Sequence, residues 1–149
     1  MMHVDTTDRP AAPRWEHFFH VADVGLRGWG ETMAQAFEQA AVALTAVITE
    51  PGSVRPRRAV DIACAAPDPE ILLADWLNAL VFEMATRGML FSRFEVTIDG
   101  CRLVARAHGE PVDVSRHHPA AEVKGATLSE LEVAQGADGS WHAQCIVDV

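Results

Sequence analysis

The spacing of apolar residues along this chain favours a fold that mixes helices with strands. Residues 31–52 and 68–88 place apolar side chains every three or four positions, which is the period of an amphipathic helix. Residues 91–110 contain two strand-like runs around an Asp-Gly pair, which is typical of a tight hairpin. The order β-α-β-α-β-β-β-β predicts an α+β domain of two layers, in which two main helices pack on a mixed or antiparallel sheet.

Local signals predict where both helices begin and end. Thr32 and Gln35 form a capping-box pattern, and the Pro-Gly pair at 51–52 stops the first helix. Asp68 is a suitable N-cap for the second helix, and Gly88 suits the left-handed residue that ends it. The expected buried faces are Phe37, Ala41, Leu44 and Ile48 in the first helix, and Leu73, Trp76 or Leu77, Leu80 and Met84 in the second.

Alternation of apolar residues and turn signals predict the strands. We expect the first strand region to be continuous but bent near Gly25 and Gly28. A polar connection at 111–120 precedes the last two strands. The strands expected in this way are residues 15–29, 58–66, the two strands of the hairpin, 121–135 and 141–149.

Length and composition are those of one globular domain. The chain has 149 residues, of which 49% are hydrophobic and 22% charged. It lacks the run of roughly 20 apolar residues that a membrane span requires. Residues 1–14 lack the apolar core of a signal peptide, so we expect a disordered tail there and a single domain over 15–149. Three cysteines without a CxxC pair fit a reducing cytoplasm, each as a small buried strand residue.

The charge of the chain restricts its partners. The formal net charge is −9, and a protein that binds nucleic acid by itself usually presents a basic surface. We therefore expect no stable direct binding of nucleic acid and no membrane association. Cations, or a protein with a basic surface, are the expected partners. The chain has eleven arginines but one lysine, Lys124, which marks either chance or a position that needs a compact ammonium.

Two aspartates stand in apolar runs near opposite ends of the sequence. Asp23 lies in "HVADVG" and Asp148 in "CIVDV", so both would meet at one end of a sheet if the first and last strands are neighbours. Two such carboxylates, with a terminal carboxylate at Val149, would suit Ca²⁺, Mg²⁺ or Mn²⁺. Glu50, after the first helix, is a further candidate ligand. The alternative for each of these residues is an ordinary solvated carboxylate.

No motif of a self-sufficient enzyme is visible in the sequence. It contains no phosphate-binding glycine loop and no serine nucleophile elbow. His117 and His118 are adjacent, without a clear third metal ligand, and we expect structural or surface roles for the histidines. We therefore expect no catalytic residues in this chain.

The sequence resembles the archease family from about residue 15 to residue 149. The resemblance is carried, in order, by "HVADVGLRGWGETMAQAFEQAA", "LLADWLNALVFEMATRGMLFSRFEV", "GEPVDVSRHHPAAEVKGAT" and "IVDV". It implies an accessory protein that activates RtcB-type RNA ligases in tRNA splicing or RNA repair, by promoting guanylylation with GTP and multiple turnover. It also implies an α+β fold with an inserted strand–helix–strand–strand module. The family's metal site, described with calcium, falls on Asp23, Asp148 and Val149.

Several positions differ from the family pattern. Val21 replaces a threonine beside the first aspartate, Glu50 replaces an aspartate, and Leu128-Ser129 replaces an aromatic–histidine pair. Lys124 matches the family lysine, which favours a functional role for it. One rival interpretation is a metal-stabilised chaperone or binding module for another RNA-modifying enzyme, and a second is a small metal-dependent phosphohydrolase. The oligomeric state and the partner's RNA substrate are left open.

Overall fold

We describe residues 12–20 and 23–149 of a computed structural model of the chain. Residues 1–11, most of the predicted tail, and Val21 lie outside the described residues. The elements in chain order are β1 (Arg14–His20), β2 (Asp23–Gly30), α1 (Met33–Ile48), η2 (Pro51–Ser53), β3 (Arg58–Ala65), α2 (Pro69–Arg87), β4 (Met89–Asp99), β5 (Arg102–Pro111), α3 (Val114–His117), β6 (Gly125–Ala126), β7 (Glu132–Gln135) and β8 (Trp141–Asp148).

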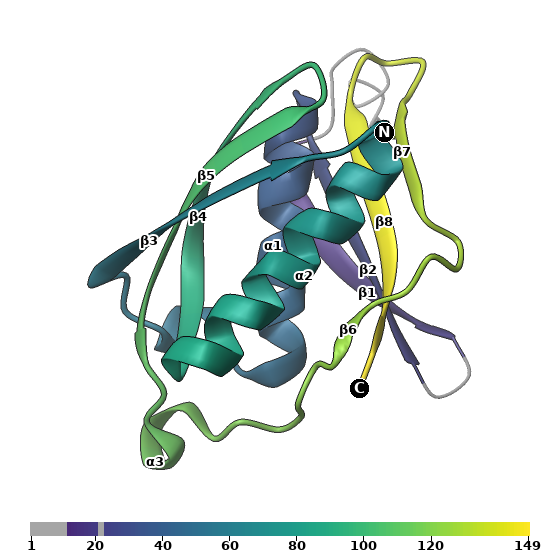
Figure 1. Cartoon of the computed structure of the whole chain (residues 1–149). Coiled ribbons are helices and arrows are strands. Elements are labelled where there is room, and N and C mark those ends of the chain that lie inside the picture. The colour runs from purple at the N-terminus through teal and green to yellow at the C-terminus, as the bar shows by residue number, and fades with distance from the viewer. Residues whose placement is uncertain (1–11, 21–22) are drawn as a thin grey trace, which may run out of the picture.

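The strands form two antiparallel sheets with the main helices between them (Figure 1). One sheet has five strands, in the order β1-β2-β8-β6 with β7 also paired to β8, and the other has three, in the order β3-β5-β4. The second sheet and α2 form the strand–helix–strand–strand module that interrupts the chain between α1 and α3. The predicted α+β class is confirmed, although the strands divide between two sheets instead of sharing one.

Helix α1 packs against both sheets. At Gly28 in β2 an added Cβ would lie 2.4 Å from the carbonyl oxygen of Ala36, so only a glycine lets the strand approach the helix so closely. On the other side, Thr45 Oγ1 donates a hydrogen bond to the carbonyl oxygen of Phe91 in β4 at 2.7 Å. The Val96 N–H in the same strand donates to Oε2 of Glu38 at 2.8 Å. These contacts fix the inserted module to the rest of the domain.

The predicted helix ends are confirmed. Thr32 caps α1 by accepting from the Gln35 N–H at 3.1 Å, and Asp68 caps α2 by accepting from the Ile71 N–H at 2.9 Å. Gly88 ends α2 with a φ of 63°. Every predicted face residue of the two helices is buried or packed against the core. Within the described ranges, no helix combines the length and the apolar character needed to cross a bilayer.

The first strand region reverses direction between His20 and Asp23, before the two glycines near which we expected a bend. It is a hairpin, in which β1 pairs with β2 and His20 lies opposite Asp23. The prediction of one strand over 15–29, bent near Gly25 and Gly28, is therefore wrong. The sequence between the two strands carries none of the usual turn residues, so local signals did not mark the reversal.

The last third of the chain is partly as predicted. The β4–β5 hairpin turns at Asp99-Gly100, where Gly100 has a φ of 60°, and β8 forms as expected. The strand expected over 121–135 is instead two short strands, β6 and β7, and Glu130 between them has a left-handed backbone with a φ of 51°. Cys145 is buried as predicted, whereas Cys101 is exposed in the hairpin turn.

Candidate functional site

Two carboxylates lie at the end of the five-stranded sheet where β2 begins and β8 ends. The register places Val24 opposite Val147, and Asp23 and Asp148 are the next residues outward on the two strands. Residues that face each other across antiparallel strands carry their side chains on the same side of the sheet. The prediction that the first and last strand regions are neighbours is confirmed for β2 and β8.

Lys124 lies on the segment that pairs with this end of β8. Its backbone N–H donates to the carbonyl oxygen of Asp148 at 2.8 Å, and the residue is exposed. The chain continues as β6, where the Ala126 N–H donates to Oδ1 of Asn78 in α2 at 2.8 Å. Strand β8 and helix α2 therefore hold the backbone that carries Lys124 beside the two aspartates.

The carboxylates at this end of the sheet supply some of the oxygen ligands that a hard divalent cation needs. Asp23 is half-buried and Asp148 exposed, so both residues are accessible from solvent. Carboxylate oxygens are the ligands that Ca²⁺, Mg²⁺ and Mn²⁺ prefer. Among residues 12–20 and 23–149, no three His, Cys, Asp or Glu side chains are grouped so that they could hold an ion. A complete coordination shell would therefore need further oxygens, such as one from Val149, from water or from a partner.

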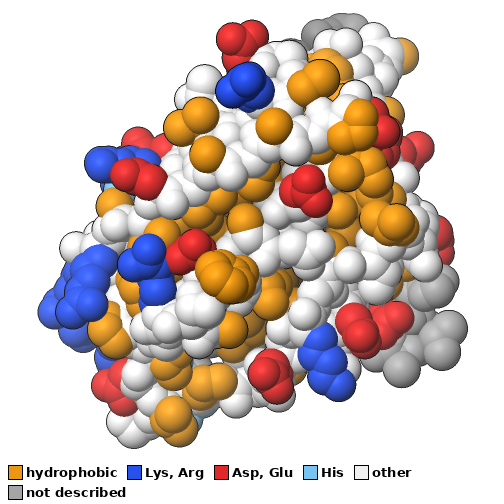
Figure 2. Space-filling model, viewed as in Figure 1, with side chains coloured by type: hydrophobic (Ala, Val, Ile, Leu, Met, Phe, Trp, Pro, Cys, Tyr) orange, Lys and Arg blue, Asp and Glu red, His pale blue; other side chains and the backbone are white. Residues whose placement is uncertain are grey.

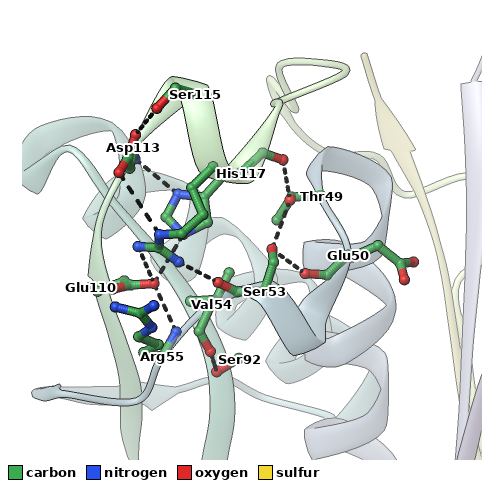
Figure 3. A network of polar contacts seen from close by, with 11 residues as sticks. Thr49, Glu50, Ser53, Val54, Arg55, Ser92, Glu110, Asp113, Ser115 and His117 are labelled. Atoms are coloured by element: carbon green, nitrogen blue, oxygen red, sulfur yellow. Dashed lines mark hydrogen bonds and ion pairs between the residues drawn. The ribbon is translucent and has the colours of Figure 1, made fainter.

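Glu50 is the N-cap residue of η2, directly after α1. Its carbonyl oxygen accepts hydrogen bonds from the Ser53 N–H at 2.9 Å and from Ser53 Oγ at 2.7 Å. Its carboxylate points away from the polar network drawn in Figure 3. Glu50 also lines a hollow of about 370 Å³ together with Arg116. It is not grouped with Asp23 and Asp148 into a three-residue ligand set.

A buried network around Glu110 joins the segment that leads into β3, the end of β5 and α3 (Figure 3). Glu110 is 4% exposed, and its Oε2 receives the Arg55 N–H at 2.8 Å and His117 Nε2 at 3.0 Å. Nη2 of Arg116 lies 2.9 Å from the same oxygen. The Arg55 backbone N–H, with the bonds from His117 and Arg116, lowers the pKa of Glu110 to about 2.

Hydrogen bonds fix the tautomer and the position of His117. Its Nδ1 accepts from the Asp113 N–H at 2.9 Å, so Nε2 carries the ring proton and donates it to Glu110. Thr49 Oγ1 at the end of α1 donates to the carbonyl oxygen of His117 at 2.5 Å. His117 is therefore a structural residue that ties α3 to α1, as expected for the histidines.

Sequence reasoning missed the Glu110 network. Its members are up to 62 positions apart, because Arg55 and His117 meet only after the module between them has folded. The signal available was a glutamate in "HGEPV", set at the end of a strand that is otherwise apolar on one face. A buried carboxylate requires donors, and that requirement could have pointed to Arg116 and His117 nearby in sequence.

The fold defines a class of α+β domain in which an inserted module separates the first hairpin and helix from the last strand, with acidic residues where β2 meets β8. The sequence profile described as the archease protein family (MTH1598/TM1083) matches residues 15–149. The chain therefore belongs to the archease family.

Relatives and solved structures agree with this assignment. Protein archease of Pyrococcus abyssi is 36% identical over 140 residues, covering 91% of this chain and 99% of the relative. Protein archease of Thermococcus gammatolerans is 37% identical with the same coverage. The solution structure of Methanobacterium thermoautotrophicum protein 1598 superposes with a TM-score of 0.80 at 32% identity, covering 91% of this chain and 98% of that one. An archease of Thermotoga maritima, described as a possible chaperone, has the same fold, with a TM-score of 0.55 at 16% identity over 89% of this chain and 94% of that one.

Proposed function

We propose that this protein activates an RtcB-type RNA ligase by promoting GTP-dependent guanylylation of the ligase, which supports multiple turnover in tRNA splicing or RNA repair. Membership of the archease family supports this function. The structural observation that carries it is the pairing of β2 with β8, which brings Asp23 and Asp148 together beside Lys124. In this proposal the protein is a cytoplasmic accessory factor and has no catalytic activity of its own.

Asp23 and Asp148, with an oxygen of Val149, would hold the divalent cation, Ca²⁺ in the first place and Mg²⁺ or Mn²⁺ as alternatives. A bound cation would supply positive charge for the phosphates of the ligase's nucleotide. Lys124 would add a compact ammonium that contacts phosphate or a ligase carboxylate. Its backbone is held by the Asp148 carbonyl, so the same strand end would position both the lysine and the carboxylates. Glu50 is a further candidate to bind the ion or to contact the ligase.

The charge of the molecule supports docking on a basic surface. With a net charge of −9, the protein would be steered toward a ligase surface that is positive around its nucleotide pocket. Such steering speeds association and weakens as salt screens the field.

A second candidate function is a chaperone or binding module for another RNA-modifying enzyme. The description of the Thermotoga maritima archease as a possible chaperone favours it. In that case the cation would only stabilise the end of the sheet. Chelation would then lower the melting temperature of the protein without changing ligase stimulation.

The proposal is tested by measuring ligase guanylylation with Asp23→Asn and Lys124→Arg. We expect each variant to reduce the stimulation at least about tenfold, because a group that stabilises charge during a reaction typically contributes that much or more. Asp75→Asn is the matched control, since Asp75 is an exposed aspartate on α2. If Asp23→Asn and Lys124→Arg both stimulate as the unmodified protein does, these residues do not act as proposed.

A further inference from the structure

Three arginines stand within four residues where the chain enters β3. Arg55, Arg57 and Arg58, which we call the arginine corner, are all exposed. None of them forms an ion pair with any residue in 12–20 or 23–149. Figure 2 shows basic side chains gathered at the left edge of the molecule, where β3 begins in Figure 1. Positive charge is therefore concentrated on one corner of an acidic protein.

The backbone of the arginine corner is held in place. The Arg55 N–H donates to Glu110 at 2.8 Å, and the Arg57 N–H donates to the carbonyl oxygen of Gly109 at 3.0 Å. Pro56 between them has a fixed φ. The carbonyl oxygen just before Arg55, that of Val54, accepts from Ser92 Oγ at 2.7 Å. The corner is therefore a preorganised segment from which exposed arginine side chains extend.

The acidic residues of the adjoining network have other partners. Glu110 is held by the backbone N–H of Arg55 and by Arg116 and His117. Asp113 accepts from Ser115 Oγ at 2.8 Å and lies 3.8 Å from Nε of Arg116. These carboxylates are therefore already paired, and they do not neutralise the side chains of the corner.

The chemistry of the corner fits a row of phosphates. A guanidinium group presents planar paired donors that match phosphate oxygens. The chain turns at Pro56, where the Arg57 N–H donates to the carbonyl oxygen of Arg55 at 2.9 Å, so the three arginines are gathered at one corner and can contact neighbouring phosphates of one backbone. Distant carboxylates repel RNA, but at 0.1 M salt charges farther than about 10 Å are largely screened. At that ionic strength the local arginines determine the interaction.

We propose that the arginine corner binds the phosphate backbone of the RNA on which the partner ligase acts. The choice of RNA rests on the proposed function, which places this protein on a ligase that carries RNA. The contact is weak for the isolated protein and becomes effective when the ligase holds both molecules together. The expectation that the chain makes no stable complex with RNA by itself is compatible with this contact.

The first experiment uses this protein without the ligase. A fluorescently labelled 20-nucleotide single-stranded RNA is titrated with the unmodified protein and with the triple variant Arg55→Gln, Arg57→Gln, Arg58→Gln, and anisotropy is measured between about 50 and 200 mM salt. The slope of log Kd against log salt should fall by about 2 in the triple variant, because each neutralised phosphate of a single strand contributes roughly 0.7. The control is a second triple variant, Arg87→Gln, Arg102→Gln, Arg106→Gln, which has the same net charge as the first triple variant. It should retain the salt slope of the unmodified protein.

The second experiment separates this proposal from the proposed function. In multiple-turnover ligation the triple variant should raise the KM for RNA on the order of tenfold, while its stimulation of guanylylation without RNA stays unchanged. If the unmodified protein does not stimulate guanylylation, the proposed function is rejected. The RNA titration alone then decides whether the arginine corner binds RNA. The arginine corner is rejected if the unmodified protein does not bind RNA at 50 mM salt, or if both triples bind alike. The proposal is also rejected if the first triple variant no longer stimulates guanylylation of the ligase but binds RNA as the unmodified protein does. In that case the corner contacts the ligase and not the RNA.

Discussion

A single carboxylate can join segments that are far apart in sequence, and Glu110 does so here. It receives hydrogen bonds from Arg55, which leads into β3, and from His117 in α3. Burial alone would favour the protonated acid, yet the donors keep the pKa of Glu110 at about 2. The charged form of Glu110 is therefore the form that stabilises both the start of β3 and the connection that leads to Lys124.

Glu110 makes the stability of the protein depend on pH in acid. Because the pKa of its carboxyl falls from 4.5 to about 2 on folding, its contribution is complete above pH 4.5 and is lost as the pH falls toward 2. In Glu110→Gln this dependence should be absent, so the unfolding free energy should fall less steeply from pH 4.5 to 2 than in the unmodified protein. Urea unfolding at a series of pH values measures the two slopes.

The control for this measurement is Glu83→Gln, whose carboxylate pairs with Arg87 on the surface of α2. Its slope should follow that of the unmodified protein. Equal slopes for Glu110→Gln and the unmodified protein would show that Glu110 does not carry the acid dependence.

At the scale of elements, helices were predictable because their signals are local. Thr32 and Asp68 cap helices that begin one residue later, and Gly88 closes α2. The β1–β2 reversal was not predictable from local signals, because no usual turn residue stands between the two strands. The separation of β6 from β7 was not predicted because it depends on how each strand pairs with β8. From the apolar runs, the adjacency of Asp23 and Asp148 was predicted only on condition that the first and last strands are neighbours, and the family resemblance then implied a shared site. The positions of Glu50 and Glu110 depend on packing.

The contact between β4 and β5 requires a glycine. A Cβ on Gly109 would lie 1.8 Å from the carbonyl oxygen of Leu90, and the backbone cannot move away without breaking the strand pairing. We expect Gly109→Ala to destabilise the protein by at least about 1–3 kcal/mol, the usual cost of overpacking. Gly52→Ala is the control, because nothing lies within 4 Å of its Cβ. Urea unfolding should separate the two variants, and equal midpoints would contradict this account of the close contact.

On the scale of the whole molecule, the helices connect the two sheets into one body. Helix α1 contacts β2 on one side and β4 on the other, and Trp76 in α2 donates to the carbonyl oxygen of Phe37 in α1 at 3.0 Å. The ring of Trp76 also packs edge-on against Phe94 in β4, with centroids 6.1 Å apart. The inserted module and the five-stranded sheet therefore share one core.

A shared core predicts that the protein unfolds in one step. Far-UV circular dichroism reports mainly the helices, whereas fluorescence of a Trp76→Phe variant reports Trp15, Trp29 and Trp141, which lie in the five-stranded sheet. We expect both signals to change at the same urea concentration, as in two-state unfolding. Two separated transitions would show that the module folds independently of that sheet.

The place of β8 has a consequence for how the protein is made. This strand pairs with β2, β6 and β7, yet it follows all of them along the chain. Strand β2 and helix α1 therefore leave the ribosome long before the strand that completes their sheet. Their apolar faces remain exposed to solvent while the inserted module is synthesised. Chaperones that bind nascent chains would have their longest opportunity on this protein during that interval.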